Sequence, residues 1–188
     1  AWYNVPIVNI VPAYDSLMIT FSSPDRVEEA GTQLAHILAG LQLIEKNTSG
    51  QEMIIPVCYD PSLGNDLEKM GEILQMNEQS IVEMHLDVCY EVYMLGFLPG
   101  FAYMGRVHEQ IATPRKDEPV ATRAGAVGIA GIQTGIYPFN SPGGWHIVGY
   151  TPLIMFDPAR SRPALLHPGD RVRFRQISLS EFEQLNQK

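Results

Sequence analysis

Glycine and proline recur every few residues from Gly96 onward, and this spacing restricts what the second half of the chain can form. Both residue types destabilise helix interiors, so the pattern argues against long helices in this half. Short strands separated by closely spaced turns are typical of a β-barrel or β-sandwich. We therefore expect a β-barrel domain over residues 87–188, with a type II turn at 167–170. Its strands are expected at the short apolar runs 126–129, 145–148, 153–156 and 171–174.

The first half of the chain alternates strand and helix signals. β-branched and aromatic residues predict strands at 8–11, 16–21 and 52–59. Apolar residues at helical spacing follow three typical N-cap residues, Ser23, Asp66 and Asn77. The predicted helices end near residues 40, 76 and 85. This pattern predicts an α+β domain over residues 1–86.

The composition limits the classes of partner. The 188 residues have a hydrophobic fraction of 45% and a formal net charge of -8, which is typical of a folded protein. An acidic chain without basic runs argues against nucleic acid and against anionic membranes as partners. No apolar run reaches the roughly 18 residues that a membrane helix needs, and no signal peptide is visible. We expect a cytoplasmic protein that binds neither nucleic acid nor membrane.

The two cysteines, Cys58 and Cys89, both lie in apolar, strand-like runs. Free cysteines are often buried, so we expect two buried thiols in a reducing compartment. No Cys-x-x-Cys pair occurs, so the sequence predicts no thiolate metal site. The P-loop pattern and the dinucleotide fingerprint are also missing, so the chain has no standard nucleotide-binding loop of its own.

Two segments combine glycine with aromatic and polar residues in a way that fits a ligand site. In residues 96–105, Phe97 and Phe101 are expected either to pack into a core or to form a rigid aromatic rim beside a ligand. In residues 113–138, glycines recur at positions 125, 128, 131 and 135. These glycines fit the bends of a barrel. They also leave space for polar side chains at a pocket mouth, namely Gln133, Thr134 and Tyr137.

A third segment, residues 140–152, places a turn before Trp145 and His146. Adjacent residues of a strand face opposite sides, so these two side chains are expected on opposite faces. His146 can act as an acid or base near neutral pH, although a lone strand histidine is more often a hydrogen-bonded structural residue. Ser141 is near it in sequence, but no Gly-x-Ser-x-Gly nucleophile elbow accompanies it.

Together the three segments resemble the family of the 5-oxoprolinase B subunit, also described as KipI-like kinase inhibitors and as allophanate hydrolase subunit 1. The resemblance covers about residues 8–175. One departure is the Thr122-Arg123-Ala124-Gly125 run, where the family often has Val-Pro-Ala-Gly. The motifs that carry the resemblance are Gly96-Phe97-x-Pro99-Gly100-Phe101-x-Tyr103-x-Gly105, Thr113-Pro114-Arg115, Ala124-Gly125-x-Val127-Gly128-Ile129-x-Gly131-x-Gln133-Thr134-Gly135-x-Tyr137-Pro138, Ser141-Pro142-Gly143-Gly144-Trp145, Phe156-Asp157-Pro158 and Pro168-Gly169-Asp170-x-Val172-x-Phe174.

The resemblance implies an N-terminal α/β domain, residues 1–86, followed by a cyclophilin-like β-barrel domain, residues 87–188, without prolyl isomerase activity. It implies that the N-terminal domain lacks its first strand and helix here. It also implies a hetero-oligomer with two different partners. One is a C subunit, related to allophanate hydrolase subunit 2, and the other is an A subunit of a different fold. ATP with Mg²⁺ is the implied cofactor of the complex, and none is evident in this chain.

The activity implied by the resemblance is ATP-dependent opening of 5-oxoproline to L-glutamate, with this chain inactive alone. Phosphorylation of the amide oxygen would activate the ring carbon for attack by water. Residue type and motif membership give the candidate site, with cations for phosphate or the substrate carboxylate (Arg115, Lys116, Arg123), polar groups for the amide (Gln133, Thr134, Tyr137), a proton relay (His146) and aromatic walls (Phe97, Phe101, Trp145).

Two other functions stay open on the sequence. The KipI-like name implies an inhibitor that covers the dimerisation region of a histidine kinase, and an exposed apolar patch would then matter more than a polar pocket. The carboxyltransferase part of urea carboxylase contains a similar pair of modules. That relationship implies a pocket that meets a carboxylated biotin carrier.

Overall fold

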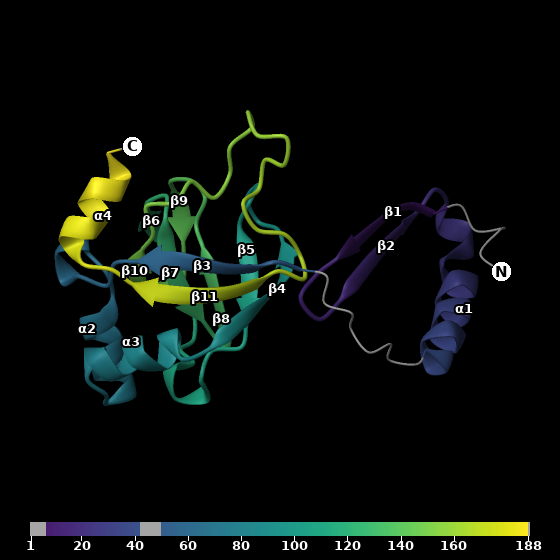
Figure 1. The fold of residues 1–188 in the computed structure, drawn as a ribbon. Coiled ribbons are helices and arrows are strands. Elements are labelled where there is room, and N and C mark those ends of the chain that lie inside the picture. Colours follow the sequence, from purple (N-terminus) through teal and green to yellow (C-terminus); the bar gives the residue numbers. More distant parts are fainter. Residues whose placement is uncertain (1–6, 42–49, 188) are drawn as a thin grey trace. The chain divides into compact units, whose positions relative to one another are not determined.

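In a computed structural model, residues 7–41 and 50–187 are described. Contacts divide the chain into two compact units, one within residues 1–47 and one within residues 48–188 (Figure 1). The boundary expected near residue 86 therefore falls inside the second unit. The physical reason is that the strand and two helices that precede residue 86 pack with the later strands.

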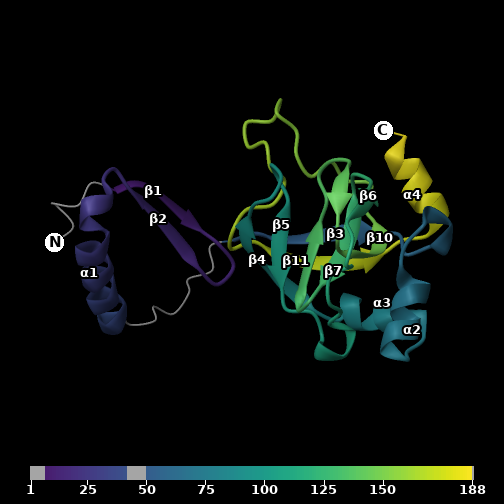
Figure 2. The same cartoon turned by 180° about the vertical axis from the view of Figure 1, so that it is seen from behind.

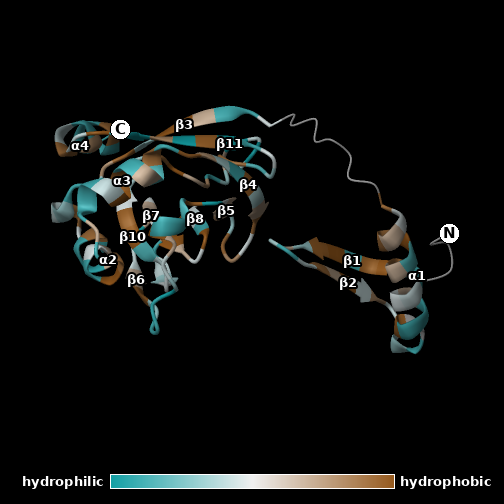
Figure 3. Ribbon diagram, turned by 90° about the horizontal axis from the view of Figure 1, so that it is seen from below, coloured by the Kyte–Doolittle hydropathy of each residue, from teal (hydrophilic) through white to brown (hydrophobic). Residues whose placement is uncertain are grey.

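The first unit is a β-hairpin followed by a helix. Strand β1 (Ile7–Pro12) pairs antiparallel with β2 (Leu17–Phe21), and a short 3-10 turn, η1 (Pro24–Arg26), leads into α1 (Val27–Gly40). Both strands and the helix were predicted from the sequence, and the helix ends at Gly40 as expected. Hydrophobic residues occupy most of β1, and they alternate with polar residues along α1 (Figure 3).

The second unit contains a large sheet, a two-stranded ribbon and three helices among the described residues. Its elements in chain order are β3 (Glu52–Val57), η2 (Pro61–Leu63), α2 (Leu67–Leu74), α3 (Glu78–Leu86), β4 (Cys89–Leu95), β5 (Ala102–Gly105), η3 (Glu109–Ile111), β6 (Val120–Thr122), β7 (Ala126–Ala130), β8 (Gln133–Ile136), β9 (Ser141–Gly143), β10 (His146–Tyr150), β11 (Arg171–Gln176) and α4 (Leu179–Asn186).

The large sheet has the strand order β10-β7-β8-β5-β4-β11-β3. All pairs are antiparallel except β3 with β11, which run parallel over six residue pairs. The sheet curls until its two edges meet, where the backbone N–H groups of Cys58 and Tyr150 donate to each other's carbonyls over 2.8 and 2.9 Å. Figures 1 and 2 show the resulting barrel-like body with α2 and α3 side by side. The predicted mixed fold with a barrel is confirmed.

Local sequence signals set several element ends correctly. The side chain of Asn77 accepts from the backbone N–H of Ser80 at the start of α3, and that of Ser178 accepts from Glu181 at the start of α4. The predicted turn at 167–170 is present, because the Asp170 N–H donates to the His167 carbonyl and Gly169 has φ 91°. Both cysteines are free, with Cys58 buried and Cys89 half-buried.

The predicted strand at 153–156 is absent from the described structure, and this prediction was wrong. Only Phe156 forms a single bridge, to Ala164, and the Leu165 N–H donates to the Met155 carbonyl. The segment follows Pro152 and precedes Pro158, and neither residue can donate to a sheet. It therefore closes on its own loop instead of joining the barrel.

A buried polar chain crosses the interior of the second unit. The Thr134 hydroxyl donates to the Gly128 carbonyl, which can only accept, so this hydroxyl accepts from His85 Nε2 at 3.0 Å. His85 Nδ1 then carries no proton and accepts from the Tyr59 hydroxyl at 2.8 Å. The ring of Phe174 stacks on His85 with a centroid distance of 4.6 Å. These hydrogen bonds connect α3 to strands β7 and β8 in the interior of the second unit.

Burial lowers the pKa of His85 to about 3, whereas an unfolded chain has a histidine pKa of about 6.5. The unfolded state therefore takes up a proton first as the pH falls below about 6.5. We expect the free energy of unfolding to decrease between about pH 6.5 and pH 3, with His85 contributing up to about 1.4 kcal/mol per pH unit. Urea unfolding at pH 7.5 and pH 5 measures this loss.

In His85→Gln the pH dependence should be shallower, although the variant is less stable at every pH. The exposed His36 provides the matched control, and His36→Gln should keep the wild-type slope. An equal slope in wild type and His85→Gln would contradict the assignment.

Candidate functional site

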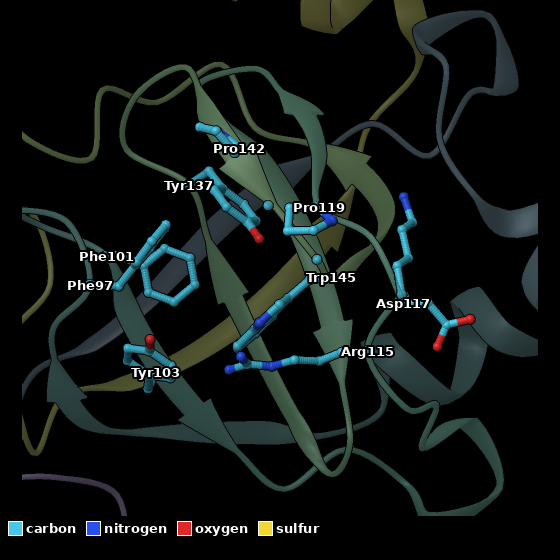
Figure 4. Close-up of a pocket in the computed structure, with 12 residues that line it drawn as sticks. Phe97, Phe101, Tyr103, Arg115, Asp117, Pro119, Tyr137, Pro142 and Trp145 are labelled. Carbon is cyan, nitrogen blue, oxygen red and sulfur yellow. The ribbon is translucent and has the colours of Figure 1, made fainter.

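A cavity of about 460 Å³ opens beside the barrel strands, and we call it the aromatic pocket (Figure 4). The turn 96–101, strand β5, the segment 113–119 and the residues around β9 contribute its walls. All three segments singled out in the sequence therefore meet there. The lining residues are Phe97, Phe101, Tyr103, Arg115, Lys116, Asp117, Pro119, Tyr137, Pro142, Gly143, Gly144 and Trp145.

Aromatic rings form the rigid part of this pocket. Phe101 is buried at the centre, with the ring centroids of Tyr103 at 4.8 Å, Tyr137 at 5.1 Å and Trp145 at 5.3 Å. The tilted and T-shaped geometries match the favourable arrangement of ring quadrupoles. Phe97 completes the wall at the mouth, where it is 62% exposed. The predicted walls Phe97, Phe101 and Trp145 thus do line one pocket.

Two glycines let the rings lie directly on the strands. Gly128 and Gly135 face each other across β7 and β8. A Cβ atom at Gly135 would lie 3.0 Å from both Phe101 Cζ and Trp145 Cζ3, and 2.9 Å from the backbone oxygen of Ala102. Such contacts are too close for well-packed atoms. The glycine spacing noted in the sequence therefore provides a flat floor for the aromatic pocket.

Tyr137 brings a hydroxyl to this floor. The hydroxyl points into the pocket (Figure 4). Burial raises the pKa of Tyr137, and the Trp145 N–H and the Arg115 charge partly oppose this shift. The phenol is therefore protonated at neutral pH, and its own proton is available to an oxygen of a ligand.

Arg115 brings the charge. Its exposed side chain makes no hydrogen bond or ion pair with any residue of 7–41 or 50–187. Figure 4 shows the guanidinium running past Trp145 toward Tyr103. Burial raises the pKa of Tyr103, and Arg115 opposes that shift, as it does at Tyr137. The guanidinium field thus acts inside the pocket, where an anionic group of a ligand would be stabilised.

Lys116 lines the same pocket, but its charge is already paired. Its Nζ lies 2.6 Å from Asp66 Oδ2, and the side chains of this ion pair are only 11% and 21% exposed. Asp117 also lines the pocket, and its carboxylate points away from the rings (Figure 4). Among the described residues that line the pocket, Arg115 is therefore the cation that remains available to a ligand.

Arg123, the third predicted cation, lies elsewhere. Its guanidinium donates to the Leu63 carbonyl and stacks over the ring of Tyr150, 4.5 Å from the ring centroid. It does not line the aromatic pocket. A cation–π contact and a backbone hydrogen bond give Arg123 a role in packing the loop before α2 against β10.

Thr134 and Gln133 also fall outside the pocket lining. Thr134 is fully buried and belongs to the polar chain with His85, so it lies behind the pocket and not at its mouth. Strand alternation puts Gln133 on the same face as Tyr137, but four residues of extended chain separate them by roughly 13 Å. The motif pointed to the correct segment of the chain, but only Tyr137 of the three predicted polar residues lines the pocket.

His146 faces a second cavity of about 410 Å³, on the other side of the segment 113–117. Its Nε2 donates to the Pro114 carbonyl at 3.0 Å, and its buried Nδ1 has no hydrogen-bond partner. Burial lowers the pKa of His146, and Asp66 partly opposes this shift. The predicted opposite orientation of Trp145 and His146 is present, so His146 does not reach the aromatic pocket.

Tyr103 is a pocket residue that was not predicted from the sequence. It follows Phe101 by two positions at the start of β5, and alternate residues of a strand share a face. That alternation was a usable signal. Asp66 was recognised only as a helix cap, and nothing local in the sequence indicates its contact with Lys116, 50 residues later.

The described residues contain neither a candidate metal cluster nor a candidate membrane-spanning helix. Within residues 7–41 and 50–187, no group of three or more His, Cys, Asp or Glu side chains is arranged to hold a metal ion. In the same part of the chain, no helix has the length and apolar character needed to cross a membrane.

Comparison with known proteins shows the family to which the chain belongs. The family model described as "Carboxyltransferase domain, subdomain C and D" matches residues 4–166. A relative from Bacillus subtilis, named as the B subunit of 5-oxoprolinase, is 46% identical over 129 residues, which are 68% of this chain and 54% of the relative. A relative of the same name from Escherichia coli O157:H7 is 40% identical over 170 residues, 89% of this chain and 77% of the relative. The chain belongs to the 5-oxoprolinase B-subunit family.

This family member spans about half the length of the Bacillus subtilis relative. Among solved structures, the urea amidolyase of Kluyveromyces lactis superposes with a TM-score of 0.75 at 20% identity, covering 97% of this chain and 13% of that one. At this identity the match shows a shared fold. This member of the B-subunit family therefore has the fold of a module that also occurs inside a much longer enzyme.

The glycine floor makes a specific prediction. Gly135→Ala should push the rings of Phe101 and Trp145 off β8 and lower the free energy of unfolding by about 1–3 kcal/mol, as expected for overpacking. Urea denaturation measures the change. Gly144→Ala is the matched control, because its new Cβ meets only the Lys116 carbonyl oxygen at 3.7 Å. Equal stability of the two variants would contradict the role given to Gly135.

Proposed function

We propose that this chain is the substrate-binding subunit of an ATP-dependent 5-oxoprolinase complex, and that 5-oxoproline binds in the aromatic pocket. The observation that carries the proposal is the unpaired guanidinium of Arg115 at an aromatic box. 5-Oxoproline is a small, nearly flat lactam ring with one carboxylate. The aromatic walls offer an apolar surface to the lactam ring, and Arg115 matches the carboxylate through paired N–H···O bonds.

The lactam oxygen has a partner in this pose. Tyr137 is protonated, and its hydroxyl is aimed into the cavity from the floor. Donation from Tyr137 would polarise the lactam carbonyl and hold it for phosphorylation of its oxygen. A fixed donor that strengthens its bond as charge develops on that oxygen lowers the barrier of the reaction.

The phosphoryl transfer itself is proposed to need the assembled complex. In this proposal ATP with Mg²⁺ is bound when the chain joins its two partners, the C subunit related to allophanate hydrolase and the A subunit of a different fold. Water then attacks the activated ring carbon, the C–N bond breaks and releases the amine, and a second water frees phosphate from the resulting acyl phosphate to leave glutamate. Support comes from the relatives, which are named as one subunit of a larger enzyme, and from the missing P-loop pattern in this sequence. The chain alone is proposed to be inactive.

A carboxyltransferase-like function is the second candidate. The description of the family model and the shared fold with a urea amidolyase favour it. In that case the aromatic pocket would hold the flat ureido ring of carboxylated biotin. The two candidates differ in their co-substrate, because the first consumes ATP and 5-oxoproline and the second consumes carboxybiotin.

Arg115→Gln tests the substrate pose. Loss of a charge-assisted hydrogen bond costs about 1.5–3 kcal/mol, so the KM for 5-oxoproline should rise by roughly 10–150-fold while the KM for ATP stays unchanged. Glutamate formation by the complex reconstituted from all three subunits provides the measurement. Arg123→Gln removes a predicted cation that lies outside the pocket and should leave both constants near wild type.

An unchanged KM in Arg115→Gln would refute the carboxylate role. A wild-type complex that forms no glutamate from 5-oxoproline and ATP, but transfers carboxylate from carboxybiotin, would favour the second candidate instead.

Tyr137→Phe tests the amide role, because it keeps the ring and removes only the hydroxyl. We expect kcat to fall by about 10-fold or more with little change in KM, since the donor acts mainly as charge develops on the lactam oxygen. Tyr59→Phe is the control for loss of a buried tyrosine hydroxyl outside the pocket. A Tyr137→Phe complex with wild-type kcat would exclude this role.

A further inference from the structure

The segment Thr113–Asp117 is the wall between the aromatic pocket and the cavity of His146, and both cavities share Arg115, Lys116 and Asp117. Backbone hydrogen bonds hold this wall on either side of Arg115. The Thr113 carbonyl accepts from the Gly131 N–H at 2.7 Å, and the Lys116 N–H donates to the Gly144 carbonyl at 2.8 Å. His146 Nε2 holds the Pro114 carbonyl. Arg115 is the cationic residue of the wall whose side chain is left for a ligand.

One carboxylate ties this wall to the body of the protein. Asp66 Oδ2 accepts from Lys116 Nζ at 2.6 Å and from the Ile147 N–H at 2.7 Å. The Asp66 N–H in turn donates to the Ile147 carbonyl at 2.6 Å. The start of α2, the start of β10 and the wall therefore meet at a single, mostly buried side chain.

Asp66 makes these contacts instead of capping α2 with its side chain. It occupies the N-cap position of α2, where an aspartate ordinarily accepts from the first backbone N–H groups of the helix. Its side chain makes no capping bond here. Asn65 Oδ1 accepts from the Leu67 N–H instead, at 3.2 Å. The carboxylate is thereby committed to Lys116 and β10.

We propose that Asp66 is a positioning residue that aims Arg115 into the aromatic pocket. This inference rests on the proposed function, since it assigns Asp66 to the binding of the substrate carboxylate through Arg115. The ion pair with Asp66 fixes Lys116, and with it the backbone next to Arg115, whose side chain runs toward the rings (Figure 4). Pairing also neutralises Lys116, so the anion-binding charge of the pocket is that of Arg115.

Asp66→Asn is the decisive variant. Asparagine keeps an oxygen for the Ile147 N–H, but its neutral amide no longer holds the Lys116 ammonium as an ion pair. The first readout needs no substrate, because protons of Arg115, whose side chain runs past Trp145 toward Tyr103 (Figure 4), should show ring-current shifts in NMR spectra of the free chain. We expect these shifts to collapse toward random-coil values in Asp66→Asn. Glu52→Gln is the matched control, since it removes the carboxylate of an exposed ion pair with Arg173 at 3.1 Å.

The second readout is kinetic and uses the reconstituted complex. Asp66→Asn should raise the KM for 5-oxoproline about 5–20-fold, with kcat little changed and with wild-type behaviour in Glu52→Gln. In an Arg115→Gln background, Asp66→Asn should add nothing further to KM. That non-additivity is the mark of a residue that acts through Arg115, and a purely structural effect would not produce it.

The outcomes separate this inference from the proposed function. Unchanged Arg115 shifts in Asp66→Asn, or fully additive KM effects with Arg115→Gln, would overturn the positioning role. Collapsed shifts in a protein whose wild-type complex does not act on 5-oxoproline would uphold the aiming of Arg115 and overturn the substrate assignment. Should Asp66→Asn not fold, Lys116→Gln breaks the same ion pair from the other side and is expected to give the same two results.

Discussion

The contact of Phe101 and Trp145 with the bare backbone of Gly135 is the constraint on which the site depends. Because no Cβ separates the rings from β8, they pack against the strand itself, and Tyr137 and Tyr103 pack around them. Ring packing of this kind fixes the shape of a cavity before a ligand arrives. Polarity is then added at few points, by one phenol on the floor and one guanidinium on the wall.

The buried and partly buried polar groups form two networks with different structural roles. The chain from Tyr59 through His85 to Thr134 is saturated with hydrogen bonds and stiffens the strands from behind. Asp66 and Lys116 form a partly buried ion pair that connects elements distant in sequence. Such a pair contributes little net stability, since desolvation offsets its attraction, but it does define a geometry. The polar side chains that belong to neither network remain available for binding and catalysis.

Local signals carried most of the fold. Apolar runs bounded by glycine and proline indicated most barrel strands, and Asn77 marked a helix start, because capping depends on neighbours in sequence. The site was predictable only in part. Phe97, Phe101 and Trp145 were found by motif, whereas the burial of Thr134 and the diversion of Arg123 to Tyr150 depend on how strands curl and on contacts across 27 residues or more. Residue type alone does not say which charges are already paired.

The parallel pairing of β3 with β11 has a consequence for how this module can be handled. A strand from the beginning of the second unit closes the sheet against one from near its end, over six residue pairs. Excision of 87–188 as a barrel would remove β3 from beside β11 and expose an unpaired strand edge that favours aggregation. Because its first and last strands pair in one sheet, the whole of 48–188 must stay together in grafting, fusion or evolutionary shuffling.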